Sequence, residues 1–272
     1  MHSDSIPVVL VISATDPTGG AGMATDIRVC QRDGVYPLCC VTAVTVQNQH
    51  GVTAVAPSDP DLVRRQLEAA FEAVVPDAVK IGLLPDAGIV KAVAEVLKKF
   101  NQKNVVLDPV LAPTCGGNFL TDRTATMRAM SEHLFGLTEL VTPNIPEYES
   151  FLDISVDGKP AWSQARNILL KGGHGDAGSD FCTDILYKNG KETVKFKSRK
   201  LQSPNLHGTG CFLSTAIAAG LARIPSLELA INHAKAELSA EIEHSSHDSL
   251  IPEYGPVFTP EQNYKLSTYS LL

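Results

Sequence analysis

The sequence has little of several features that mark common classes of protein. It lacks an excess of positive charge, because 23 Lys and Arg stand against 30 Asp and Glu for a formal net charge of −7. Nucleic acids and anionic membranes select basic surfaces, so we expect neither as a partner. No run approaches the roughly 18 consecutive apolar residues that a transmembrane helix needs. The first seven residues have no basic segment and no small-residue cleavage site, so we expect no signal peptide.

Paired cysteines are also absent. None of the six cysteines forms a Cys-x-x-Cys pair, and no short Cys or His spacing suggests a zinc site. The six are Cys30, Cys39, Cys40, Cys115, Cys182 and Cys211. Free thiols of this kind indicate a reducing, cytoplasmic environment. A chain of 272 residues that is 44% hydrophobic can bury a core of its own without disulfide or metal staples.

Short apolar runs alternate with longer amphipathic stretches along the chain. The expected strands are Pro7–Ser13, Leu38–Gln47, Ala78–Ile81, Val105–Asp108, Leu140–Thr142 and Ile168–Lys171. The expected helices are Met23–Asp33, 59–75 with Asp59 as N-cap, Asp86–Phe100, Gly208–Ala222 and Leu227–Glu243. Asn189-Gly190 predicts a type I′ hairpin within 183–197. This alternation predicts a mostly parallel sheet covered on both faces, in one domain over 1–243, with 244–272 as an irregular segment of unknown role.

Two glycine-rich stretches stand at expected helix starts, where free backbone N–H groups can bind an anion. The first, Thr15–Gly22, is neither a P-loop nor a dinucleotide fingerprint, and a tight turn explains it equally well. The second is His207-Gly208-Thr209-Gly210-Cys211. There the helix dipole would favour a Cys211 thiolate, although an inert buried cysteine is the commoner alternative.

Polar side chains at the ends of apolar strands form the remaining candidates, since ligands of such folds bind at the carboxyl edge of the sheet. Asp108 and Glu147 could hold Mg²⁺, although Glu147 also suits the first turn of a helix. Lys171 could contact phosphate or simply be solvated at a strand end. The amide of Gln47 could bind the edge of a heterocycle or make a loop hydrogen bond.

Together these stretches resemble the ribokinase-like superfamily, and within it the hydroxymethylpyrimidine kinase/phosphomethylpyrimidine kinase family of thiamine biosynthesis. The resemblance spans roughly residues 8 to 223, with the motifs in the family's order. The matching segments are Ile12–Gly22, Thr42–Gly51, Val79–Leu83, Val105–Val110, Thr142–Glu147, Lys171–His174 and His207–Cys211. The last is specific, because many sugar kinases of the superfamily have Asp in place of the cysteine.

The resemblance implies a three-layer α/β/α fold in a single domain without a large lid, and a homodimer. It implies phosphorylation of 4-amino-5-hydroxymethyl-2-methylpyrimidine and then of its monophosphate, with ATP and Mg²⁺. By the family's pattern, Gln47 would bind the aminopyrimidine in a pocket lined by Ala21, Leu83 and Val110, with Asp26 nearby. Gly208, Thr209 and Gly210 would form the anion hole, with Cys211 in the position of the base. Asp108, Asn144 and Glu147 would serve Mg²⁺ and the phosphates, and Lys171 the phosphate chain.

The sequence departs from the family's pattern in three places. Ala14 stands where glycine is usual, the connection between Glu147 and Lys171 leaves room for a helix only around Ala161–Leu170, and 244–272 matches nothing. Two other functions are compatible with the motifs: a pyridoxal kinase of the same superfamily, and a non-catalytic sensor of pyrimidine phosphates.

Overall fold

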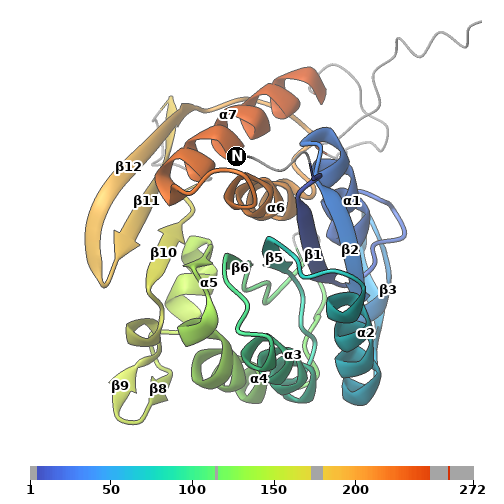
Figure 1. Ribbon diagram of the computed structural model, residues 1–272. Coiled ribbons are helices and arrows are strands. Elements are labelled where there is room, and N and C mark those ends of the chain that lie inside the picture. The colour runs from blue at the N-terminus through green and yellow to red at the C-terminus, as the bar shows by residue number, and fades with distance from the viewer. Residues whose placement is uncertain (1–4, 114–115, 173–179, 246–256, 258–272) are drawn as a thin grey trace, which may run out of the picture.

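A computed structural model describes residues 5–113, 116–172, 180–245 and 257. Its main sheet has eight strands in the order β12-β11-β10-β7-β6-β5-β1-β2, and β11 alone runs antiparallel to its two neighbours, β10 and β12 (Figure 1). These strands are β1 Val8–Ser13, β2 Tyr36–Val41, β5 Ala78–Ile81, β6 Val105–Leu107, β7 Leu140–Val141, β10 Asn167–Leu170, β11 Phe181–Lys188 and β12 Lys191–Arg199. The α-helices are α1 Gly22–Arg32, α2 Pro60–Ala73, α3 Ala87–Lys99, α4 Arg123–Ala129, α5 Ile145–Ser150, α6 Thr209–Leu221 and α7 Leu227–Ser245.

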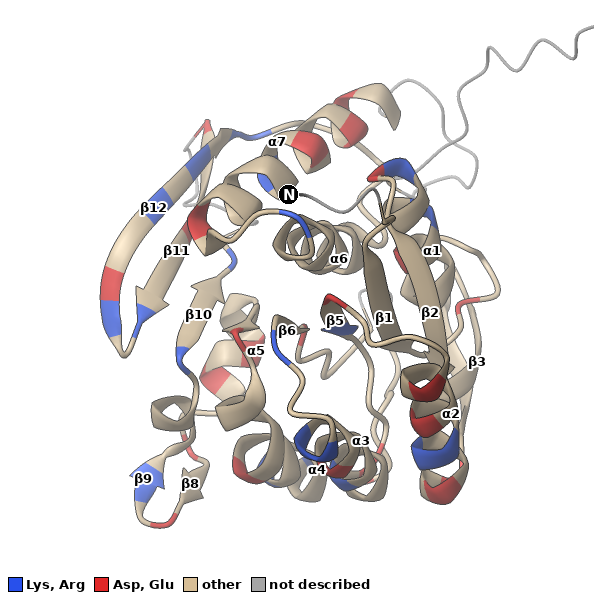
Figure 2. Cartoon of the chain, in the orientation of Figure 1, with Lys and Arg blue, Asp and Glu red and all other residues tan. Residues whose placement is uncertain are grey.

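Helices cover both faces of the sheet, because the side chains of its central strands are apolar on both sides. On β1, Leu10 and Ile12 pack with α2, α3 and α4, whereas Val9 and Val11 pack with α1, α6 and α7. β1 and α6 contain no Lys, Arg, Asp or Glu (Figure 2), as expected for elements buried between layers. The predicted three-layer arrangement is confirmed.

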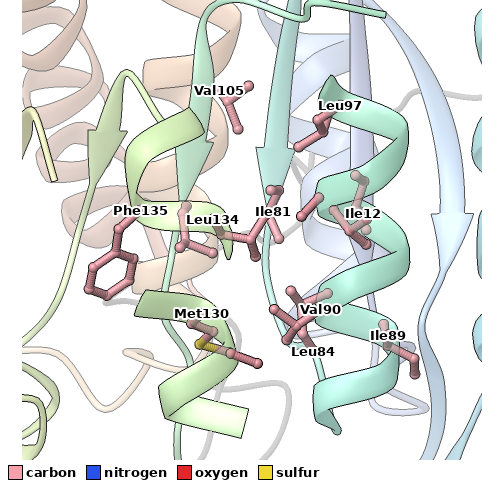
Figure 3. Close-up of a cluster of buried hydrophobic side chains, with 14 of the residues drawn as sticks. Ile12, Ile81, Leu84, Ile89, Val90, Leu97, Val105, Met130, Leu134 and Phe135 are labelled. Atoms are coloured by element: carbon pink, nitrogen blue, oxygen red, sulfur yellow. The ribbon is translucent and has the colours of Figure 1, made fainter. Parts of the chain in front are cut away.

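The core beneath α3 shows how the layers are held together. Ile12 and Ile81 of the sheet belong to one buried cluster with Ile89 and Val90 of α3, and Leu134 joins it from the adjoining helical segment (Figure 3). All five side chains are fully buried. Burying one such side chain stabilises the fold by roughly 1.5–3 kcal/mol, so this layer anchors the strands whose ends carry the polar candidates.

The prediction of one strand over Leu38–Gln47 is wrong, because the chain leaves the main sheet at Thr42. The Thr42 N–H donates to Ser13 O at 3.1 Å and its hydroxyl donates to Leu83 O at 2.6 Å. The chain then forms β3 Ala43–Asn48, which pairs with β4 Gly51–Pro57 in a separate antiparallel sheet. The sequence over 38–47 has no glycine, proline or charged residue that would indicate this change of sheet.

Other expectations have mixed outcomes. Asp59 caps α2 as predicted, and Asn189 and Gly190 have φ values of 50° and 75° at the hairpin turn. The sequence reading missed β4, α4, α5 and a small hairpin of β8 Ser155–Val156 and β9 Lys159–Pro160. No long helix forms over 161–170, since a 3₁₀ turn at Ala161–Gln164 leads directly into β10.

The carboxyl end of the chain is described only in part. Helix α7 continues to Ser245, two residues beyond its predicted end at Glu243. Of the remaining segment only Val257 is described, so the assignment of 244–272 stays a prediction. Among the described helices, none combines the length and hydropathy needed to cross a bilayer.

Candidate functional site

The polar candidates gather at one edge of the main sheet. The loop Thr15–Ala21 follows β1, Asp108 follows β6, Asn144 follows β7 and Lys171 follows β10. These strands are parallel, so their carboxyl ends lie on the same side. The strand order also reverses direction at β1, since β2 pairs with one side of β1 and β5 with the other. Ligands of open α/β sheets bind at such a reversal point.

Asp16 organises the first glycine-rich loop from within. Its carboxylate accepts the N–H of Thr18 and the N–H of Ala21, each at 2.9 Å. Nε2 of His207 lies 2.7 Å from the same carboxylate. Burial by itself would raise the pKa of Asp16, but the hydrogen bonds from His207 and Thr18 lower it below its usual value. Asp16 therefore stays ionised and ties the first loop to the segment that precedes α6.

The two glycine-rich loops touch at Gly208. This residue has φ +85°, and a Cβ built on it would lie 2.0 Å from Gly20 O and 3.4 Å from Ala21 Cα. A side chain is therefore excluded twice, by the left-handed backbone and by the opposing backbone. The start of α6 thus lies directly against the loop that leads into α1.

Cys211 occupies the first turn of α6, as predicted, but it is not a thiolate. The pKa of its thiol is raised to about 11, mainly by burial, and the charges of Asp26 and Asp108 act in the same direction. Lys80 and the backbone N–H of Gly22 act in the opposite direction. The expectation of a dipole-stabilised thiolate is therefore wrong, because desolvation outweighs the helix terminus. The sulfur still faces the site, since it lies beside the first amide of α1.

A compact charged group lies next to the start of α6. Lys171 Nζ is 2.8 Å from Asp108 Oδ1. A Cβ built on Gly210 would lie 3.5 Å from both Asp108 Oδ2 and Lys171 Nζ. Ser214, one turn further along α6, places its hydroxyl 3.4 Å from Asp108 Oδ2. The glycines of the predicted anion hole and the predicted phosphate-binding lysine are therefore neighbours.

Glu147 combines the two roles that its sequence position allowed. With Asn144 it forms a capping box at the start of α5, in which each backbone N–H donates to the other's side chain at 2.8 Å. The pKa of Glu147 is raised to about 7, mainly by burial, with the charge of Lys171 opposing the rise and the charge of Asp108 adding to it. The helix cap thus holds this carboxylate beside the Asp108–Lys171 pair, and Asn144 contributes as the cap.

The described residues contain no group of three or more His, Cys, Asp or Glu side chains arranged to hold a metal ion. Asp108 and Glu147 nevertheless supply two buried carboxylates that share the single positive charge of Lys171. Mg²⁺ commonly binds through one or two carboxylates while keeping waters and phosphate oxygens as its other ligands. The donor set therefore fits Mg²⁺ accompanied by phosphates, rather than a cage formed by protein alone.

The predicted pocket residues come from β3 and from the segments that follow β5 and β6. Gln47 is partly buried on β3, two residues after Thr45, whose hydroxyl donates to Thr15 O at 2.8 Å. Alternate residues of a strand share a face, so Gln47 lies on the face that β3 turns toward this loop. Leu83 is buried just after β5, and Val110 is partly buried after β6.

Asp26, predicted to lie near this pocket, is a buried residue with partners inside the protein. Its side chain is fully buried on α1, one turn after Gly22, and its oxygens bind Lys80 and Thr215. It therefore lies beneath the pocket and has no surface for substrate.

Sequence reasoning gave no role to His207, Lys80 or Thr215. A usable signal existed for Lys80, because a lone lysine inside the apolar strand Ala78–Ile81 requires a buried partner. Gly173 and His174 of the fourth motif and Cys115 lie outside the described residues. Cys30, Cys39, Cys40 and Cys211 are free thiols.

Comparison with known proteins gives three kinds of match. The family model described as phosphomethylpyrimidine kinase matches residues 16–257. A hydroxymethylpyrimidine/phosphomethylpyrimidine kinase of Rhizobium meliloti is 35% identical, over 92% of this chain and 96% of that protein. The crystal structure of an ADP complex of Bacillus subtilis pyridoxal kinase superposes with a TM-score of 0.75 at 29% identity, covering 88% of this chain and 92% of that chain.

Other relatives are longer proteins. The probable thiamine biosynthetic bifunctional enzyme of rice, a chloroplastic protein, is 33% identical over 96% of this chain, which spans 48% of the rice protein. The chain thus spans about half the length of some curated relatives that it matches.

Proposed function

Because the chain belongs to the phosphomethylpyrimidine kinase family, we propose that it phosphorylates 4-amino-5-hydroxymethyl-2-methylpyrimidine and then the resulting monophosphate, using ATP. Similarity to the hydroxymethylpyrimidine/phosphomethylpyrimidine kinase of Rhizobium meliloti supports this choice of substrate. Similarity to a kinase crystallised with ADP supports a nucleotide as the phosphoryl donor.

One observation carries this proposal: the start of α6 joins the two halves of the site. Gly208 packs against Gly20 of the first loop, and Gly210 adjoins Asp108 and Lys171. A substrate alcohol held near the first loop and a phosphate chain held near Lys171 would therefore meet at the amide hydrogens of residues 208–211. Phosphoryl transfer requires the attacking oxygen to lie close to the phosphorus while hydrogen-bond donors stabilise the negative charge of the transferring group.

In the proposed transfer, the hydroxymethyl oxygen attacks the γ-phosphorus of ATP while the bond to the β-phosphate oxygen breaks. The N–H groups at the start of α6 stabilise the charge that spreads over the transferring group. Lys171 contacts the phosphate chain, and Mg²⁺ bound at Asp108 and Glu147 would neutralise part of its charge. Cys211 is protonated near neutral pH, so it holds the hydroxyl by hydrogen bonding in the ground state. The alcohol proton passes late to an oxygen of the transferred phosphoryl group, which a loose transition state allows.

In the proposed pocket, Gln47 hydrogen-bonds the aminopyrimidine. Ala21, Leu83 and Val110 contact the ring, because apolar walls with one or two polar groups are usual for such ligands. The phosphate of the monophosphate substrate would face the same loop amides in the second transfer.

The test is phosphoryl transfer by the purified chain with ATP and Mg²⁺. We expect ADP formation with the hydroxymethylpyrimidine and again with its monophosphate. Similarity to a pyridoxal kinase favours pyridoxal as an alternative substrate, so kcat/KM is compared for the two alcohols. A larger kcat/KM for pyridoxal would replace the proposal with the alternative. Tight pyrimidine binding without any ADP would instead indicate a sensor.

A homodimer and a cytoplasmic location are further proposals for this chain. Exposed apolar side chains on β3 and on the edge strand β2, namely Val44, Val46 and Tyr36, support an interface between copies. Light scattering after size-exclusion chromatography should give twice the chain mass of 29.1 kDa. Val46→Lys should shift the equilibrium between monomer and dimer toward the monomer.

Fractionation of the producing cells would test the proposed cytoplasmic location.

A further inference from the structure

A buried ionic cluster lies directly beneath the site, and the proposed transfer does not use it. Asp26 on α1 binds Lys80 on β5, with Nζ 2.8 and 2.9 Å from the two carboxylate oxygens. Both side chains are fully buried. Thr215 on α6, also fully buried, donates its hydroxyl to Asp26 Oδ1 at 2.7 Å. The cluster therefore joins a central strand to two helices of the same layer.

The spacing of these residues relates the cluster to the catalytic end of both helices. Asp26 is four residues after Gly22, and Thr215 is four residues after Cys211. Residues four apart lie on the same face of a helix, one turn from each other. The contact between Gly22 N–H and the Cys211 sulfur and the contact between Asp26 and Thr215 are thus successive links between α1 and α6.

From this geometry we infer that Asp26, held by Lys80 and Thr215, is a positioning residue that sets the start of α6 against the start of α1. Through that spacing it places Cys211 and the amide hydrogens of residues 208–211 relative to the substrate loop. The inference rests on the proposed phosphoryl transfer, because positioning is defined here by its effect on that step.

The chemistry of the cluster suits a rigid link. Burial alone would lower the pKa of Lys80, but the Asp26 carboxylate raises it above its usual value, so the ammonium stays charged. A buried charge pair with a third hydrogen bond has few alternative arrangements, since any other would leave a charge unpaired. Elsewhere along these helices the Arg32 guanidinium of α1 lies 4.5 Å from the centre of the Phe212 ring of α6, a contact without the charge pairing of the cluster.

The decisive variant is Thr215→Val, which removes the hydroxyl and keeps the shape. We expect kcat to fall about tenfold with both KM values within about twofold, since a loosened contact displaces catalytic groups more than ground-state binding groups. Thr215→Ser retains the hydroxyl and should restore most of kcat. The matched control is Thr25→Val on α1, because the buried Thr25 hydroxyl meets no hydrogen-bond partner among the described residues. That variant should keep the wild-type kcat.

A second readout does not depend on activity. Alkylation of Cys211 by iodoacetamide, followed by peptide mass spectrometry, should change in rate at least about threefold in Thr215→Val and remain unchanged in Thr25→Val. Wild-type kcat and alkylation in Thr215→Val would overturn the inference, as would equal losses in both valine variants. If the wild-type chain transfers no phosphoryl group at all, the proposed function fails, while the alkylation rates still decide whether the cluster positions the sulfur.

Discussion

The contact between the two glycine-rich loops yields the sharpest prediction, Gly208→Ala. Residue 208 has φ +85°, which costs an alanine about 1–2 kcal/mol in strain. Its Cβ would also lie 2.0 Å from Gly20 O, where ordinary contact begins at 3.4 Å, so the loops must separate by 1.4 Å. A displacement of about 1 Å at reacting groups lowers the rate roughly 10²-fold, so kcat/KM should fall by about that factor or more.

A matched control separates the effect of backbone strain from the effect of displacing the two loops. Gly190 has φ +75° at the β11–β12 turn, and a Cβ there would meet nothing within 4 Å. Gly190→Ala therefore carries the backbone strain without the collision, and should lower the melting temperature by about 2–8 °C while leaving kcat/KM unchanged. The assay is ADP release coupled to NADH oxidation, with melting followed by circular dichroism. If folded Gly208→Ala kept kcat/KM within about threefold of wild type, the proposed meeting of nucleophile and phosphate at this contact would be refuted.

Three further predictions concern individual side chains of the site. Cys211→Ala should lower kcat about 10²-fold or more if the thiol orients the alcohol, and near-wild-type turnover would show that the helix-start amides suffice. Gln47→Ala should weaken pyrimidine binding by roughly 1–3 kcal/mol in calorimetry, and an unchanged affinity would remove Gln47 from the pocket. Because the pKa of Cys211 is raised to about 11, its thiolate fraction grows with pH far above neutrality. Its alkylation rate should therefore rise about tenfold per pH unit up to about pH 10, whereas a plateau below pH 9 would contradict the raised pKa.

Local sequence patterns were sufficient for much of the fold. Apolar runs such as Val8–Ser13 predicted the buried parallel strands, since a strand covered on both faces must be apolar throughout. Asp59 and Asn189-Gly190 predicted a helix start and a hairpin, because capping and left-handed turns depend on neighbouring residues alone. The same reasoning failed at Thr42, where two hydrogen bonds to distant backbone atoms turn the chain out of the main sheet.

The candidate site divides in the same way. The sequence by itself determined which residues stand at strand ends and helix starts, including Asp108, Lys171 and Cys211, because those positions follow from local periodicity. Only the tertiary structure decided their state and their partners. In the folded chain Gly208 packs against Gly20, desolvation raises the pKa of the partly buried Cys211 thiol, and Asp26 pairs with Lys80 in the interior. Contact, burial and charge pairing arise between residues that are far apart in the sequence, such as Asp26 and Thr215, which are 189 positions apart. A local sequence pattern therefore cannot predict them.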